Sequence, residues 1–186
     1  MAQRVRPGPG APGWDDADAA VEQLYAGHWR QLVRLSVLLV RDQGTAEEVV
    51  QDAFVELHRR WGRLEDPDKA LAYLRQTVVN RSRSVLRHRK VVNRHLDQER
   101  ARPETLHTAA ADESVAHADR RDAVLDALRR LPRRQREVLV LRYYLDLSEG
   151  EIATTLGVSR GSIKSHASRG AAALRALLPD SLLEGR

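Results

Sequence analysis

The chain has 186 residues, a formal net charge of +5 and no cysteine. This length allows one or two domains with a buried core, and the basic charge favours a polyanionic partner. The absence of cysteine excludes disulfides, thiolate zinc sites, iron–sulfur ligation and a cysteine nucleophile. Nearly all the basic residues are arginines, which suit phosphate contacts but can equally reflect the base composition of the genome.

Nothing in the sequence resembles a secretion signal or a membrane span. The first residues, MAQRVRPGPGAPGWDD, contain no apolar core, and no apolar run reaches 18 residues. Residues 1–17, rich in Gly and Pro at their start, are expected to form a disordered tail. We therefore expect a cytoplasmic protein without membrane insertion.

Three helices are predicted between residues 18 and 92, which form the first expected domain. Apolar residues recur at three- and four-residue steps over 19–40, 46–61 and 68–92, so each helix has one apolar face. Gly44 is expected to end the first helix, and Thr45 with Glu48 to form a capping box for the second.

Two of these helices carry charged outer faces. The acidic face of the second helix is a solvated surface unless a partner covers it. The cations in the second half of the third helix have no acidic residue among them, and a nucleic-acid backbone explains such a run better than solvent does. The residues concerned are Gln51, Asp52 and Glu56 on the second helix, and Arg81, Arg83, Arg87, Arg89, Lys90 and Arg94 on the third.

Apolar periodicity disappears over 93–117, which reads as a flexible linker, and returns in the second expected domain, 118–178. Within that domain Ser148 and Glu151 form a capping box, and Gly157 supplies the left-handed residue that ends the helix. Ser159 then caps a helix that lasts until the proline at the start of a short tail, 179–186. Two helices joined by a glycine turn indicate a helix-turn-helix.

The second helix of this motif has cationic and polar residues and no acidic residue before Asp180. A helix that enters the DNA major groove needs cations for phosphates and polar side chains for base edges. The alternative is an ordinary helical hairpin, which would require the cap, the glycine and the apolar spacing to coincide by accident. The candidate DNA contacts are Arg160, Lys164, Ser165, His166, Ser168 and Arg169.

No catalytic pattern is present. The sequence has no H-E-x-x-H, phosphate-binding Gly-rich loop or G-x-S-x-G, and its seven histidines lack ligand spacing. We expect an all-α protein of two small helical domains that is not an enzyme and has no metal, cofactor or small-molecule substrate.

The C-terminal domain resembles region 4 of bacterial sigma factors over LPRRQREVLVLRYYLDLSEGEIATTLGVSRGSIKSHASRGAAALR. The N-terminal domain resembles region 2 over TAEEVVQDAFVELHRRW and AYLRQTVVNRSRSVLRHRK. The two regions, in this order across a linker, are similar to the extracytoplasmic-function group of the sigma-70 family, and the LRYY-x-DLSE run is most similar to its actinobacterial SigE-like branch. The resemblance implies a subunit that directs core RNA polymerase to promoters.

The resemblance also implies which residues meet which partner. Gln51, Asp52 and Glu56 would dock on the β′ clamp of core RNA polymerase, and the β flap is a second expected contact. An opened −10 strand needs phosphate cations and a polar pocket for an extruded base, and the residues that would meet it are Asn80, Arg81, Arg83, Ser84 and Arg87. The helix-turn-helix would place Lys164, Ser165, Ser168 and Arg169 in the −35 major groove, with Arg160 and His166 at the backbone.

Promoter DNA is therefore an expected partner, and an anti-sigma factor is a further candidate. The loop RLEDPDK lacks the aromatic-Arg-Gly-Asp pattern common in the family, so no −10 base preference follows from the resemblance. Two other classes stay open. A stand-alone helix-turn-helix regulator would dimerise and bind duplex sites by itself, and an adaptor would bind polymerase without reading DNA.

Overall fold

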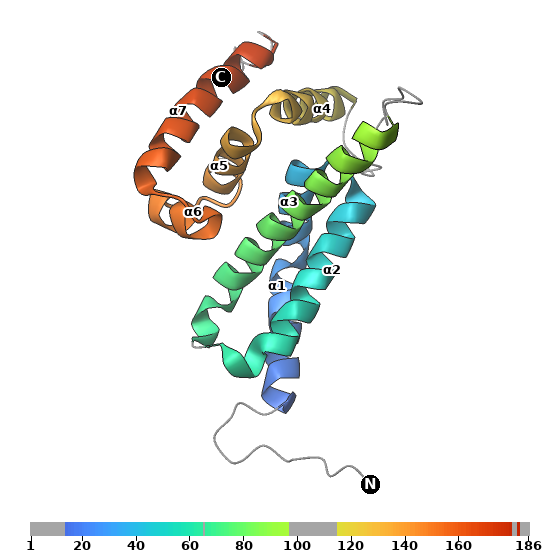
Figure 1. Ribbon diagram of the computed structural model, residues 1–186, viewed down its shortest axis with the longest axis vertical. Coiled ribbons are helices and arrows are strands. Elements are labelled where there is room, and N and C mark those ends of the chain that lie inside the picture. The colour runs from blue at the N-terminus through green and yellow to red at the C-terminus, as the bar shows by residue number, and fades with distance from the viewer. Residues whose placement is uncertain (1–13, 65, 97–114, 180–181, 183–186) are drawn as a thin grey trace.

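The computed structural model describes residues 14–64, 66–96, 115–179 and 182. These residues form α-helices and two short 3-10 turns, with no strand among them, which confirms the all-α prediction (Figure 1). The expected tails and linker lie mostly outside the described residues. The elements are α1 (Trp14–Val40), α2 (Gln43–Arg60), η1 (Trp61–Arg63), η2 (Pro67–Lys69), α3 (Ala70–Leu96), α4 (Val115–Arg130), α5 (Arg133–Tyr143), α6 (Glu149–Leu156) and α7 (Arg160–Leu177).

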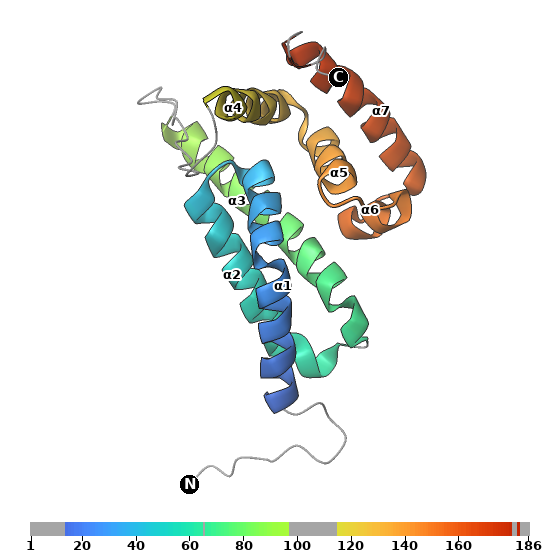
Figure 2. The same ribbon diagram turned by 180° about the vertical axis from the view of Figure 1, so that it is seen from behind.

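The helices α1, α2 and α3 run side by side as a long three-helix unit (Figures 1 and 2). Their apolar faces meet along its axis, as the three- and four-residue spacing predicts. Side chains that are fully buried there include Leu32, Leu35, Val50, Leu57, Leu74 and Val78. Tyr25 of α1 is 45% exposed; its ring stacks on Trp29 and makes an edge-to-face contact with Phe54.

The C-terminal unit consists of α4 to α7, with α5 packed against α7 and α6 turned across their ends. In both ribbon views α5 and α6 lie next to the three-helix unit and α7 lies on the outer side (Figures 1 and 2). Ile152 and Ile163 are fully buried at the crossing of α6 and α7, as the helix-turn-helix prediction requires.

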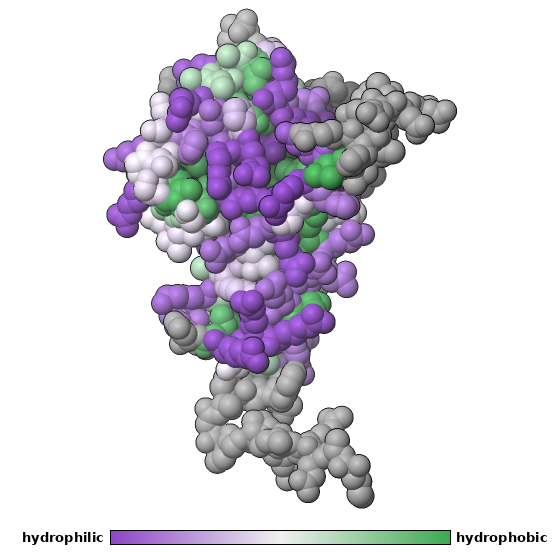
Figure 3. All heavy atoms as spheres, viewed as in Figure 1, coloured by the Kyte–Doolittle hydropathy of each residue, from purple (hydrophilic) through white to green (hydrophobic). Residues whose placement is uncertain are grey.

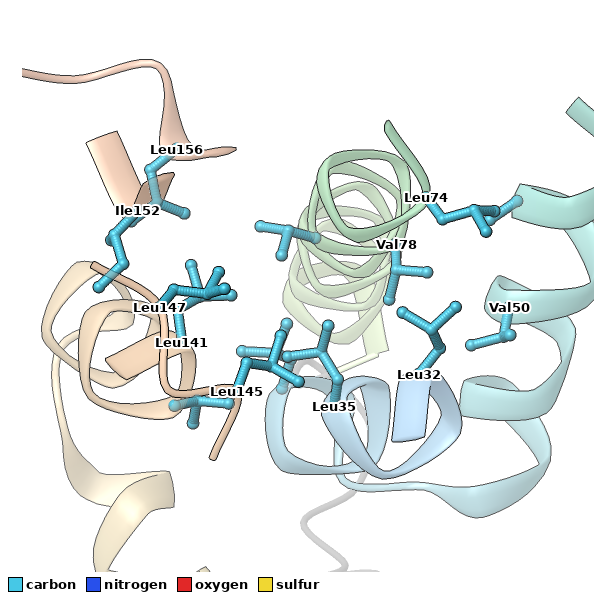
Figure 4. Packing of buried hydrophobic residues seen from close by; sticks show 14 of the residues in the cluster. Leu32, Leu35, Val50, Leu74, Val78, Leu141, Leu145, Leu147, Ile152 and Leu156 are labelled. Atoms are coloured by element: carbon cyan, nitrogen blue, oxygen red, sulfur yellow. The ribbon is translucent and has the colours of Figure 1, made fainter. Parts of the chain in front are cut away.

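One continuous apolar core joins the two units. Figure 4 shows buried side chains of α1 and α3, such as Leu35 and Val78, on one side of the boundary. Leu141, Leu145 and Leu147 of the C-terminal unit lie on the other side. The −35 and −10 candidate helices are therefore held in a defined relation to each other.

The helix termini agree with the sequence prediction in the C-terminal unit. Ser148 and Glu151 form the complete capping box, with the Ser148 N–H donating to Glu151 at 2.8 Å. Gly157 ends α6 with φ of 66°, a left-handed conformation that favours glycine. Ser159 caps α7 by accepting a hydrogen bond from the backbone of Ser162.

The predicted start of α2 was wrong. Asp42, not Thr45, is the N-cap, and its carboxylate accepts from the Thr45 backbone N–H at 2.8 Å. Gly44, expected to end α1, lies inside α2. The chain turns instead at Arg41, which has φ of 71°, and an aspartate directly after this turn is placed to satisfy the first free N–H groups of the helix.

Candidate polymerase and promoter interface

Helix α7 has two distinct faces. Ile163, Ala167 and Gly170 recur along one side and are buried against the rest of the C-terminal unit. In the ribbon view α7 lies on the side of the C-terminal unit that is away from the three-helix unit (Figure 1). Of the six predicted −35 residues, His166 is half-buried and the others are exposed: Arg160, Lys164, Ser165, Ser168 and Arg169.

The close fit of α7 against α5 fixes how this exposed face is presented. A Cβ atom added at Gly170 would lie 3.1 Å from Cβ of Gln135 and 3.2 Å from Cγ of Leu139. The absence of a side chain at this point lets the two helices approach closely. A cationic helix face on a rigid support is what reading a major groove requires.

The predicted −10 residues on α3 fall into two groups. Asn80, Ser84 and Arg87 are exposed, and Arg87 donates a 3.4 Å hydrogen bond to Oγ of Ser84. The other two, Arg81 and Arg83, are held by carboxylates, so they are not free in this arrangement. Neither the pairing of Arg81 with the acidic face of α2 nor that of Arg83 with a carboxylate of the C-terminal unit was predicted from the sequence.

Arg81 connects α3 to the acidic face of α2. Its Nη1 donates to Asp52 at 2.8 Å, and its Nη2 donates to Glu56 at 3.1 Å. Glu56 also accepts from the hydroxyl of Tyr73 at 3.1 Å. Burial alone would raise the pKa of Glu56, but the hydrogen bonds from Tyr73 and Arg81 outweigh it, so this pKa lies below its usual value.

The acidic face contains an apolar residue that the sequence analysis did not single out. Val55 is 43% exposed. On α2 it follows Gln51 and Asp52 by one helical turn and directly precedes Glu56. An exposed apolar side chain among polar ones is common at protein interfaces. Its position in the sequence, one helical turn after Gln51, could have placed it on the same outer face of the helix.

Arg83 reaches across to the C-terminal unit. Its Nε and Nη2 donate to the two carboxylate oxygens of Glu137 on α5 at 2.8 and 2.9 Å. Glu137 is only 2% exposed and also accepts from Nη1 of Arg134 at 3.2 Å. A predicted −10 contact is thus paired with a buried carboxylate of the other unit.

A cleft of about 1030 Å³ lies between the two units. Arg63, Lys69 and Arg75 line it from the three-helix unit, and Ser148 and Arg160 from the C-terminal unit. Figure 3 shows hydrophilic residues over most of the surface of this view of the molecule. Burial lowers the pKa of Arg75, and its Nε has no hydrogen-bond partner among the described residues.

The described part of the chain contains no group of three or more His, Asp or Glu side chains that could hold a metal ion. Within the same residues, no helix is both long enough and apolar enough to cross a membrane.

Two family profiles match the two units. Residues 24–91 match Sigma-70 region 2, and residues 121–174 match Sigma-70, region 4. Among curated proteins, the chain is 36% identical over 156 residues to the RNA polymerase sigma-E factor of Streptomyces avermitilis, covering 83% of each chain. It is 33% identical over 159 residues to the ECF RNA polymerase sigma factor SigM of Mycobacterium tuberculosis, covering 86% of this chain and 77% of SigM.

Solved structures show the same fold. The sigma factor RpoE of Bartonella quintana, solved in complex with the anti-sigma factor NepR, matches with a TM-score of 0.69 at 23% identity, covering 84% of this chain and 94% of RpoE. CnrH, solved in complex with the cytosolic domain of CnrY, matches with a TM-score of 0.61 at 25% identity, covering 87% of this chain and 93% of CnrH. The chain therefore belongs to the extracytoplasmic-function group of the sigma-70 family, non-catalytic subunits that direct RNA polymerase to promoters through regions 2 and 4.

Proposed function

We propose that α7 reads the −35 element, that α3 contacts the −10 element, and that the outer face of α2 docks on the β′ clamp of core RNA polymerase. The observation that carries this proposal is the division of α7 into a buried face and a cationic exposed face. Lys164 and Arg169, five residues apart, are both exposed. Their charges suit phosphates and guanine edges in a major groove.

The −10 assignment is supported by the charge and exposure of α3. Asn80, Ser84 and Arg87 offer polar and cationic groups at successive turns of one helix. Single-stranded DNA is held by cations along its backbone and by stacking of its bases. Tyr73, on the same helix and half-buried, is the aromatic residue nearest to this surface in the sequence.

The polymerase assignment rests on the α2 face. Gln51, Asp52 and Val55 are exposed and adjacent, and Glu56 is half-buried beside them. Acidic residues around an apolar one suit a basic, partly apolar partner surface. We place the β flap contact on the C-terminal unit and the site of action in the cytoplasm, where polymerase and DNA are found.

An anti-sigma factor completes the proposed set of partners. RpoE and CnrH, which share the fold, were each solved with a second protein, in the first case a named anti-sigma factor. The cleft between the two units has a largely apolar lining with cationic side chains from both of them, such as Arg63 and Arg160, and the carboxylates of Asp66 and Glu151. A protein that bound both units together would keep the promoter-reading surfaces from DNA.

The test of the polymerase assignment is competition for purified core RNA polymerase. Labelled full-length protein should bind core polymerase and be displaced by an established sigma factor of the same bacterium. Asp52→Asn together with Val55→Ser should weaken binding about tenfold or more, because the two changes remove a charge and an apolar contact from one patch.

Glu22→Gln is the matched control, because Glu22 is an exposed carboxylate on α1 and lies outside the proposed patch. Its affinity for polymerase should equal that of the unsubstituted protein. If the folded protein does not bind polymerase but binds duplex DNA tightly as a dimer, the stand-alone regulator is correct instead.

A further inference from the structure

The strongest polar contact between region 2 and region 4 is the ion pair of Arg83 and Glu137. Both carboxylate oxygens of Glu137 accept from the guanidinium, at 2.8 and 2.9 Å. The side chains are 15% and 2% exposed, so water and salt screen the pair poorly. A bidentate, buried arginine–carboxylate pair is among the strongest hydrogen-bonded contacts in proteins.

Glu137 depends on this contact because it has lost its hydration. Arg134 at 3.2 Å and Arg133 at 3.7 Å belong to its own helix and stay with it if the units separate. Arg83 comes from the other unit. A carboxylate buried by an interface needs partners from both sides of that interface, so the pair favours the closed arrangement over an open one.

The same arrangement is incompatible with a whole promoter. Arg75, on the same helix as the −10 surface, and Arg160, at the start of the −35 helix, line one cleft of about 1030 Å³. Positions −35 and −10 are 25 nucleotides apart, which is roughly 85 Å along duplex DNA. Regions 2 and 4 must therefore separate before one promoter can meet both surfaces.

We propose that the Arg83–Glu137 pair is an intramolecular lock, in which region 4 holds one residue of the −10 surface in the free protein and Glu137 occupies the place of a DNA phosphate at Arg83. The inference deepens the proposed function, because it takes Arg83 as a −10 contact. Opening frees Arg83 for DNA and leaves Glu137 with Arg133 and Arg134. Region 4 is then the first competitor that promoter DNA must displace.

The lock can be tested on the free full-length protein, because the chain has no cysteine of its own. Spin labels at Gln23→Cys on α1 and Ala172→Cys on α7, both exposed positions, report the distance between the units by pulsed electron paramagnetic resonance. We expect one narrow distribution in the parent protein. Glu137→Gln should add longer distances, with about a tenfold rise in the ratio of open to closed molecules.

Two further variants make the result decisive. Arg83→Gln should open the protein as well, without altering region 4. Glu149→Gln is the matched control, because Glu149 pairs with Arg142 inside region 4 at 3.5 Å, and it should change nothing. Narrow, unchanged distances in folded Glu137→Gln and Arg83→Gln would overturn the lock.

Core RNA polymerase separates this inference from the proposed function. Because only the open fraction is competent, Glu137→Gln should bind core polymerase up to about tenfold more tightly than the parent protein. Polymerase added to the labelled parent protein should convert short distances to long ones, and a bound protein that stays closed would overturn the lock. If no variant binds polymerase, the proposed function fails, while the distances still decide whether the lock exists.

Discussion

Arg81 on α3 donates a hydrogen bond to Asp52 on α2 at 2.8 Å, so a proposed DNA contact and a proposed polymerase contact neutralise each other. The pair is solvent-accessible, with side chains 36% and 63% exposed, and such pairs contribute about 0.2–1 kcal/mol. A cationic polymerase surface that binds Asp52 would therefore release part of the charge of Arg81 at little cost. We therefore expect docking and −10 binding to be coupled through this pair.

The first prediction follows from this coupling. Asp52→Asn should weaken binding to core polymerase and at the same time strengthen binding of the free protein to single-stranded DNA, by about two- to fivefold. The reason is that Arg81 then has only Glu56 as a carboxylate partner. Fluorescence anisotropy with a labelled single strand measures the second effect. Glu22→Gln is the control, an exposed carboxylate on α1 outside this network, and an equal gain there would contradict the coupling.

The second prediction concerns the −35 helix. Lys164→Ala and Arg169→Ala should each weaken promoter binding by the holoenzyme, by about 1–3 kcal/mol if the lost contact is a bidentate base contact. If the lost contact is to a phosphate, the slope of log affinity against log salt concentration should also become smaller by about one, because one counterion fewer is released on binding. Arg175→Ala removes an exposed cation from the last turn of the same helix and should have little effect. Equal losses of promoter affinity at all three positions would indicate that the positive charge of α7 as a whole, and not specific contacts, drives binding.

Much of this molecule could be predicted from sequence where a local pattern determines the structure. Ser148 with Glu151 and the glycine at 157 determine helix ends through contacts within a few residues, and the structure contains them as predicted. Thr45 with Glu48 has the same pattern, but the capping box predicted there was wrong. Asp42 reaches the same free N–H groups from a turn that begins at Arg41 with positive φ, and a non-glycine residue in that conformation gives no clear signal in one sequence.

The interface between the units could not be predicted for a different reason. Glu137 is a charged residue on a short helix with charged neighbours, and in sequence it looks like a solvated residue. Its burial depends on Arg83, which is 54 residues away. Similarly, Tyr144 donates to the backbone oxygen of Gln31 at 3.3 Å, across 113 residues. Contacts of this range depend on how two separately predictable units pack.

The third prediction uses two glycines of α7 as a matched pair. Gly170→Ala should destabilise the protein by about 1–3 kcal/mol, because the new Cβ would meet Gln135 and Leu139 at 3.1–3.3 Å and force α5 and α7 apart. A Cβ atom added at Gly161 would meet nothing within 4 Å, so Gly161→Ala should stabilise the helix by up to about 1 kcal/mol. Urea unfolding of both variants measures the difference, and destabilisation of equal size would refute the packing argument.

The fourth prediction is a pH dependence of the helix-turn-helix cap. The hydrogen bonds from Ser148 lower the pKa of Glu151 in the folded protein. A lowered folded pKa means that the contribution is present above the unfolded value and is lost as pH falls through the folded one. Ser148→Ala should cost about 1 kcal/mol at neutral pH and less below pH about 4, measured by thermal unfolding across that range. A cost independent of pH would contradict this account.

The fifth prediction concerns Arg136 of α5, which is 6% exposed and whose Nε has no hydrogen-bond partner among the described residues. Burial lowers its pKa, and burial together with Arg136 and Arg129 lowers the pKa of Arg41 to about 10. Burial and Arg133 disfavour the charge of Arg136, while Glu137 favours it, and a buried cation that its neighbours compensate only in part opposes folding. Arg136→Met keeps the aliphatic volume and removes the charge, so it should increase the free energy of unfolding. Each kcal/mol of that increase should raise the melting temperature by about 2–4 °C. Arg130→Met, an exposed change on α4, should leave it unchanged, and a lower melting temperature for Arg136→Met would show that this arginine stabilises the fold.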